Sequence, residues 1–199
     1  MRWRAQRETF SGGAVTRPVN LIVIHCSASA DGKTLMRGDA RKRTLRSSAQ
    51  VIDGWHAERG FHRSDYWRGV LNPKLEAIGY HWLIDVDGAI ESGRHLDEVG
   101  AHCVGQNTRS VGICMLGTGR FTVQQWGALA SLVASMRLKY PGARVCGHRD
   151  LSPDKDGDGL VEPWEWLKTC PGFDVAPWLA RGCLPLVEDI FQAPPKEPV

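Results

Sequence analysis

The stretch "VNLIVIH", residues 19–25, constrains the fold more than any other part of the sequence. It is short and rich in β-branched apolar residues, which is typical of a buried strand, and it ends at His25. The stretches "SVGICMLG" (110–117) and "ARVCGH" (143–148) predict two further strands, and the second of these ends at His148. Strand ends that meet at one edge of a sheet are common places for functional sites.

Helical segments alternate with these strands. "SSAQVIDGWHAER" (47–59) predicts a helix, and a second helix over 123–140 begins after a capping threonine, Thr122. "YHWLID" and "GAIESG" predict a hairpin that turns at 86–88, whereas 62–77 is expected to be loop. The alternation predicts an α/β fold with a mixed central β-sheet flanked by helices. We expect an N-terminal extension (1–18), one domain (19–180) and a C-terminal tail (181–199) whose end, "APPKEPV", is frayed.

Composition excludes several classes of protein. The chain has 199 residues and a formal net charge of +3, and its basic cluster at 41–43 is too short to predict nucleic-acid binding. No apolar run is long enough for stable membrane insertion. Residues 1–13 lack the apolar region of a secretory signal, so we expect synthesis in the cytoplasm without a signal peptide. The six cysteines show no paired spacing, which argues against a disulfide framework.

Residues 154–165 match the calcium-loop pattern D-x-[DN]-x-[DN]-G-x5-E without a mismatch. Carboxylates at alternate positions converge as the chain wraps an ion, a glycine allows the sharp turn, and a backbone carbonyl and a bidentate glutamate complete the shell. A flexible acidic surface loop is the alternative. The predicted calcium ligands are Asp154, Asp156, Asp158, the carbonyl of Leu160, and Glu165.

A second metal set is suggested by His25, His148 and the cysteine of "LKTC", Cys170. Two imidazoles and one thiolate suit zinc and leave a fourth position open for water. The residues alone leave this open, because a chain with seven histidines and six cysteines offers many such trios, and a lone histidine is more often structural.

Six segments resemble the zinc-dependent N-acetylmuramoyl-L-alanine amidases, in particular the phage lysozyme-like branch, whose fold is shared with the peptidoglycan recognition proteins. They lie in order between residues 19 and 179: "LIVIHCSAS", "IDGWHAERGF", "GYHWLIDVDGAIESGRHLDEVGAH", "NTRSVGICMLG", "GHRDLSPD" and "KTCPGFDV". The resemblance implies that His25, His148 and Cys170 are zinc ligands. It also implies that Tyr80 and Lys168 are catalytic. His102 and Asn107 match cleft positions that contact the peptide or the sugar in relatives, with a structural role as the alternative.

The implied reaction is hydrolysis of the amide between N-acetylmuramic acid and L-alanine of the stem peptide. The resemblance favours a phage endolysin, a monomer that acts on peptidoglycan in the periplasm after release. Alternatives are a cytosolic amidase that recycles muropeptides, a peptidoglycan-binding or regulatory protein with little catalysis, and a toxin-like effector. Substrate preference, intact sacculi against soluble fragments, separates the first two.

The two metal predictions are connected in sequence. The acidic loop fills most of the 21 residues between His148 and Cys170. We expect calcium to fix the start of a short helix, "PWEWLK" (163–168), which carries Lys168 and leads to Cys170. In this hypothesis calcium shapes the site and zinc supplies the chemistry.

Overall fold

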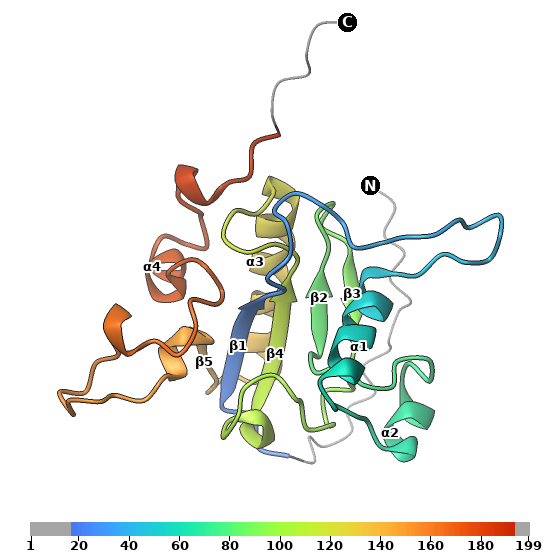
Figure 1. The fold of residues 1–199 in the computed structure, drawn as a ribbon. Helices are drawn as coiled ribbons and strands as arrows, with labels where there is room; N and C mark the ends of the chain where they lie inside the picture. Colours follow the sequence, from blue (N-terminus) through green and yellow to red (C-terminus); the bar gives the residue numbers. More distant parts are fainter. Residues whose placement is uncertain (1–16, 194–199) are drawn as a thin grey trace, which may run out of the picture.

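A computed structural model describes residues 17–193, so the predicted extension up to residue 16 and most of the Pro-rich end lie outside the described residues. Five strands form one sheet in the order β3-β2-β4-β1-β5 (Figure 1). β1 pairs in parallel with both β4 and β5, β2 pairs in parallel with β4, and β2 and β3 form the predicted antiparallel hairpin. The mixed sheet is therefore confirmed. The strands are β1 (Leu21–Cys26), β2 (Trp82–Ile84), β3 (Ile90–Ser92), β4 (Ser110–Met115) and β5 (Arg144–Gly147).

Helices cover both faces of the sheet, as Figure 1 shows for α1 and α3. α1 (Ser48–Glu58) and α3 (Val123–Lys139) lie where the sequence predicts helices, and each begins with a capping box. Side chains alternate along β1, so Ile22 and Ile24 join the core beneath α3 while Val23 packs on the opposite side. α1 packs against a separate apolar cluster that contains Leu83 and Leu116.

Three features differ from the predicted elements. A short helix, α2 (Asp65–Val70), lies in the segment expected to be loop. α4 (Val175–Ala180) closes one side of the core, where Val175 and Trp178 are buried. The helix expected over 163–168 is wrong: only η3 (Pro163–Glu165) is helical, and Trp166 leaves the helical region at ψ 125°. The remaining 3-10 turns are η1 (Asn107–Arg109), η2 (Arg149–Leu151) and η4 (Val187–Asp189).

Both flanks of the predicted domain contact its core. Arg17 is buried, and its guanidinium donates to the carbonyls of Leu96 and Ser110. Beyond α4, Ile190 forms a β-bridge with Phe121. Among residues 17–193, no helix has the length and apolar character to cross a bilayer.

Buried charges hold the segment between β3 and β4. Arg63 and Glu98 form an ion pair at 2.8 Å with both side chains almost fully buried, and Arg94 lies 3.3 Å from the same carboxylate. Arg63 also donates to the carbonyls of Leu71 and Leu75. Buried ions need such complete pairing, since an unpaired charge in the interior is very costly. The network fixes the loop that carries His102.

Candidate functional site

The two strand-end histidines lie side by side because β1 and β5 are neighbouring parallel strands. Ile24 is in register with Gly147, so the next residue of each strand, His25 and His148, emerges at the same edge. The N–H of His148 donates to the carbonyl of Ile24 at 3.0 Å. The imidazole centroids are 4.6 Å apart.

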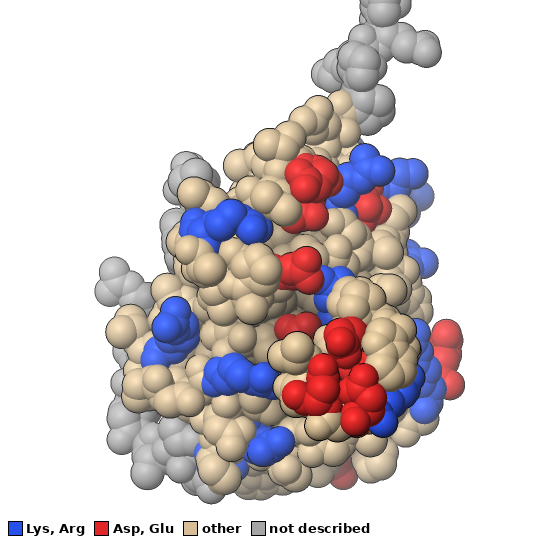
Figure 2. Space-filling view, turned by 90° about the vertical axis from the view of Figure 1, so that its left-hand side faces the viewer, with Lys and Arg blue, Asp and Glu red and all other residues tan. Residues whose placement is uncertain are grey.

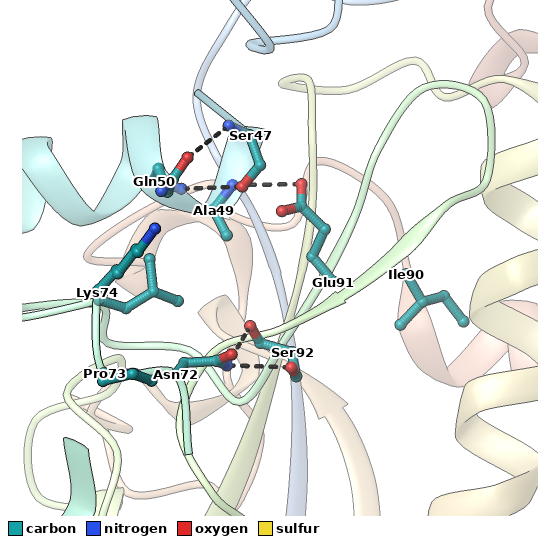
Figure 3. Close-up of a pocket in the computed structure, with 10 residues that line it drawn as sticks. Ser47, Ala49, Gln50, Asn72, Pro73, Lys74, Ile90, Glu91 and Ser92 are labelled. Atoms are coloured by element: carbon teal, nitrogen blue, oxygen red, sulfur yellow. Dashed lines mark hydrogen bonds between the residues drawn. The ribbon is translucent and has the colours of Figure 1, made fainter. Parts of the chain in front are cut away.

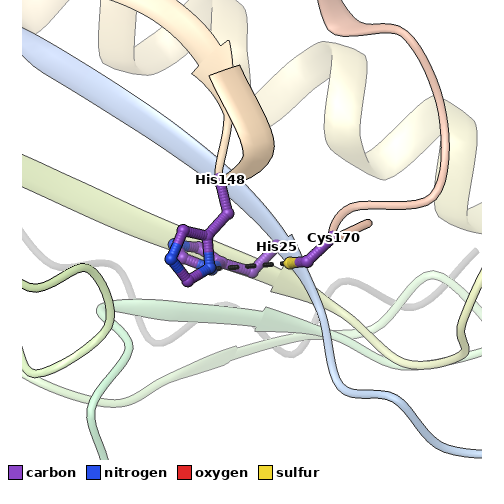
Figure 4. A group of neighbouring side chains, drawn as sticks. All are labelled: His25, His148 and Cys170. Carbon is purple, nitrogen blue, oxygen red and sulfur yellow. Dashed lines mark hydrogen bonds between the residues drawn. The ribbon is translucent and has the colours of Figure 1, made fainter. Parts of the chain in front are cut away.

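Cys170 reaches the same point from the segment after η3. Its carbonyl accepts from the N–H of Arg149, and its Sγ accepts from the N–H of Cys26 at 3.2 Å. Figure 4 shows the Cys170 thiol directed at the two imidazoles. The Sγ lies 3.7 Å from Nδ1 of His25, and one ligand atom from each of the three residues lies within 4.8 Å of the others.

This geometry suits zinc. Zn–S bonds of about 2.3 Å and Zn–N bonds of about 2.0 Å at a tetrahedral angle place nitrogen and sulfur about 3.5 Å apart. The observed separation of 3.7 Å is close to that value. Burial lowers the pKa of His25, and burial followed by the charge of Lys168 lowers the pKa of His148 to about 4. Both imidazoles are therefore neutral at pH 7, as metal ligands must be.

The Cys170 thiol has a second sulfur beside it. A hydrogen bond between the side chains of Cys26 and Cys170 raises the pKa of Cys170 and lowers that of Cys26 to about 7. A bound cation reverses this preference at Cys170, because it stabilises the thiolate directly. Cys170, which faces both histidines, is the thiolate ligand that the geometry supports.

Tyr80 and Lys168 lie beside this group. The Tyr80 ring centroid is 5.2 Å from that of His25. Burial raises the pKa of Tyr80, so its hydroxyl keeps its proton and can donate it in a hydrogen bond. Lys168 is exposed, and its positive charge is near enough to lower the pKa of both His25 and His148. Tyr80 thus packs against His25 of this group, and Lys168 acts on the two histidines through its charge.

His102 and Asn107 contact protein groups of the site. Nδ1 of His102 lies 3.0 Å from Nε2 of His25, and the side-chain oxygen of Asn107 accepts from the N–H groups of His102 and Cys103. The contact between His25 and His102 was not predicted, because no local pattern relates residues so distant in the chain. The sequence signals are Gly100 and Gly112, where a Cβ would lie 2.5 Å and 2.7 Å from the His102 ring.

The acidic segment folds into a compact loop. Oδ2 of Asp154 accepts from the N–H of Gly159, and Asp158 accepts from that of Leu160. Glu165 is fully buried and accepts from the N–H groups of Lys155 and Glu162.

Carboxylate oxygens converge within this loop. Two sets lie close enough to share an ion, one formed by Asp154, Asp156 and Glu165 and the other by Asp156, Asp158 and Glu162. Burial, followed by the charges of Asp158 and Asp156, raises the pKa of Glu162. Figure 2 shows acidic side chains crowded on the face that carries this segment.

A cavity of about 550 Å³ lies elsewhere, between the start of α1, the 72–75 segment and β3 (Figure 3). Its polar groups bind one another: Asn72 donates to Ser92, and Glu91 accepts from the N–H of Ala49. None of the predicted site residues lines it. The predicted metal-ligand group therefore lies at the strand ends and not in this cavity.

Comparisons with known proteins identify the family and the fold. Residues 15–173 match the family model described as N-acetylmuramoyl-L-alanine amidase. The endolysin of Klebsiella phage KP32 is 32% identical over 165 residues, which cover 79% of this chain and 83% of that protein. The N-acetylmuramoyl-L-alanine amidase LysC from Clostridium intestinale superposes with a TM-score of 0.54 at 26% identity over 81% of each chain. Bumblebee PGRP-SA shares the fold, with a TM-score of 0.52 at 20% identity over 82% of this chain and 81% of that one.

Proposed function

Because the chain belongs to the N-acetylmuramoyl-L-alanine amidase family, we propose that it hydrolyses the amide between N-acetylmuramic acid and L-alanine in peptidoglycan. The observation that carries this proposal is the convergence of His25, His148 and Cys170 at one edge of the sheet, with Tyr80 beside them. A binding protein of this fold has no need for a complete set of metal ligands with a tyrosine and a lysine next to it.

We propose zinc as the metal of this group. When bound, zinc supplies a Lewis acid that polarises the scissile carbonyl and activates water for attack. Neutral His25 and His148 and the Cys170 thiolate would hold it. The backbone N–H of Cys26 would stabilise that thiolate through the hydrogen bond to its Sγ.

Tyr80 and Lys168 would stabilise the reaction as negative charge develops on the carbonyl oxygen. The Tyr80 hydroxyl stays protonated and can donate a hydrogen bond to that oxygen or to the attacking water. The Lys168 ammonium carries a positive charge that acts on both histidines, and its attraction for the substrate would grow as the tetrahedral oxyanion forms. Both interactions are stronger in the transition state than in the ground state, which is the condition for catalysis.

The cellular role that we propose is that of a phage endolysin. The relative from Klebsiella phage KP32, named an endolysin, aligns over most of both chains. In this role a monomer made in the cytoplasm reaches periplasmic peptidoglycan after release. Preference for soluble muropeptides over intact sacculi would instead identify a recycling amidase.

We also propose that residues 154–165 bind calcium. Glu162, at the ninth position of the loop, supports this: its Oε2 is buried, and no hydrogen-bond partner for it exists within residues 17–193. Its neighbours Asp156 and Asp158 are also carboxylates, and a divalent cation is the partner that such a cluster lacks. Since η3 ends at Glu165, calcium would fix the chain just before Lys168, although no continuous helix connects them.

One experiment tests both metals and the activity. The purified protein is analysed for metal content by mass spectrometry, and its release of stem peptides from purified sacculi is measured. We expect zinc and calcium in equal amounts and peptides with a free L-alanine amino terminus. A protein that holds neither metal and releases no peptide would favour a peptidoglycan-binding role.

A further inference from the structure

His102 lies behind the proposed zinc site. Its Nδ1 is 3.0 Å from Nε2 of His25, and its Nε2 is 3.3 Å from the hydroxyl of Ser110. The Ser110 hydroxyl is in turn 2.8 Å from the carbonyl of Gln106. These contacts form one chain of hydrogen bonds. It runs from the Gln106 carbonyl to Nε2 of His25, on the ring edge away from the Cys170 thiol.

The direction of each bond follows from the last member of the chain. A backbone carbonyl can only accept, so the single hydrogen of the Ser110 hydroxyl points to Gln106. The hydroxyl oxygen must then accept from Nε2 of His102. A neutral imidazole carries one hydrogen, so Nδ1 of His102 is bare and accepts from Nε2–H of His25. Nδ1 of His25, which faces Cys170, is left with a free lone pair.

Both rings are closely packed, and above pH 7 an imidazole of ordinary pKa is neutral, as this assignment requires. His25 is 1% exposed, and His102 packs against Gly100 and Gly112 so closely that a Cβ at either glycine would lie under 3 Å from its ring. Asn107 holds the backbone of the same turn by accepting from the N–H of His102. The ring therefore has little freedom to turn away from His25.

We infer that His102 is a positioning residue that, through Ser110 and the Gln106 carbonyl, fixes His25 in the tautomer whose Nδ1 binds the metal. Partners of this kind orient metal-bound histidines and typically contribute 10–100-fold to metal affinity. The inference rests on the proposed zinc site. It gives His102 a role within the protein in place of the substrate contact expected from the resemblance.

The tautomers can be measured in the metal-free protein by long-range ¹H–¹⁵N NMR of the imidazoles above pH 7. We expect both His25 and His102 to carry their hydrogen on Nε2. Resonances of His25 that show the hydrogen on Nδ1 would overturn the inference, whatever the activity of the enzyme.

Zinc affinity gives a second test, measured by competition with a chromophoric chelator. His102→Leu should weaken zinc binding about 10–100-fold. His102→Asn, whose amide oxygen can replace Nδ1 as the acceptor, should restore most of the loss. Ser110→Ala changes little volume and should weaken binding about tenfold, at the low end of this range, even if His102→Leu folds poorly. His95→Gln, in the same segment but outside the hydrogen-bond chain, is the matched control.

The outcomes separate the two proposals. Folded His102→Leu and Ser110→Ala proteins that bind zinc as tightly as the wild type would overturn the positioning role and leave the amidase proposal intact. A wild-type protein that binds no zinc would overturn the proposed function, and this inference with it. Replacement of zinc by Co²⁺ adds a spectroscopic check, because an altered ligand-field spectrum in His102→Leu reports a changed metal site independently of turnover.

Discussion

The backbone N–H of Cys26 points at the Sγ of Cys170 across 3.2 Å, although the two residues are 144 positions apart. The same Cys170 sulfur lies 3.7 Å from Nδ1 of His25, the residue before Cys26. One end of β1 thus supplies both a proposed ligand and a hydrogen bond to another proposed ligand. A thiolate that accepts an N–H hydrogen bond is stabilised. The end of β1 therefore contributes to the proposed metal site both through His25 and through the N–H of Cys26.

Replacement of Cys170 by serine should abolish zinc binding. Serine keeps the shape of the side chain but offers a hydroxyl that does not ionise near pH 7. We expect zinc content close to zero by mass spectrometry and peptide release from sacculi reduced at least about a hundredfold. Cys183→Ser, which changes a thiol outside the proposed ligand set, should retain both. Retained zinc in Cys170→Ser would remove Cys170 from the ligand set.

Lys168→Met should separate metal binding from catalysis. The side chain is exposed, so the melting temperature and the zinc content should stay at wild-type values. The turnover number should fall about 10²–10³-fold, the usual cost of losing one group that stabilises an oxyanion. Lys74→Met, at an exposed lysine that lines the cavity near α1, is the control and should be fully active. Equal turnover in the two variants would contradict a catalytic role for Lys168.

Calcium should stabilise the zinc-loaded protein. At about a hundredfold excess over its dissociation constant, a ligand adds roughly 2.7 kcal/mol to the free energy of unfolding, or about 5–10 °C for a domain of this size. Asp158→Asn should reduce that shift, because the amide oxygen can keep the turn to Leu160 while the charge is lost. Asp87→Asn is matched, since Asp87 makes the same kind of turn to Ala89 in the β2–β3 hairpin. A melting temperature that does not change when calcium is added would contradict calcium binding by residues 154–165.

Acid should destabilise the fold through its buried histidines. His56 accepts the N–H of Gly79 at Nδ1, and burial, followed by the charge of Arg59, lowers its pKa to about 4. The unfolded chain takes up a proton near pH 6.5 that the folded chain refuses until about pH 4, so the free energy of unfolding falls as the pH drops through that interval. His81, whose pKa burial lowers to about 3, acts in the same direction.

His56→Asn isolates this contribution. Asparagine can still accept the N–H of Gly79 but does not titrate, so the free energy of unfolding should depend less steeply on pH, by up to about 1.4 kcal/mol per pH unit. Urea unfolding at several values between pH 6.5 and 4.5 measures the difference in slope. Parallel curves for the two proteins would show that His56 is protonated equally in the folded and unfolded states.

The sequence predicts most of the sheet but little of the loops. β1, β4 and β5 are marked by compact apolar runs, and α3 by a capping threonine and Pro141, signals that act within a few residues. α2 was not predicted because none of its residues is buried, so its sequence shows no apolar periodicity. The predicted 163–168 helix is limited to η3, and the chain beyond it extends toward β1, where Cys170 lies. The Trp166 ring then packs under the Arg149 guanidinium, 4.1 Å from its centroid.

For the site, too, local sequence patterns predict some features and not others. His25 and His148 can be paired from the sequence, because ends of neighbouring parallel strands meet. Their tautomers and the part played by His102 depend on the turn at 102–107 and on the space beside Gly112, and no local pattern encodes these.

The position of β1 between β4 and β5 also bears on how the chain matures during translation. Leu21 pairs with both Ser110 and Arg144, so β1 lacks both of its neighbouring strands until residues 110–147 have been made. An unpaired apolar strand is prone to aggregate, and strand pairing over such distances is slow. The proposed ligands are synthesised in the order His25, His148, Cys170. A chain truncated before Cys170 would therefore lack one of the three proposed metal ligands. Amidase activity would then require synthesis to continue past Cys170.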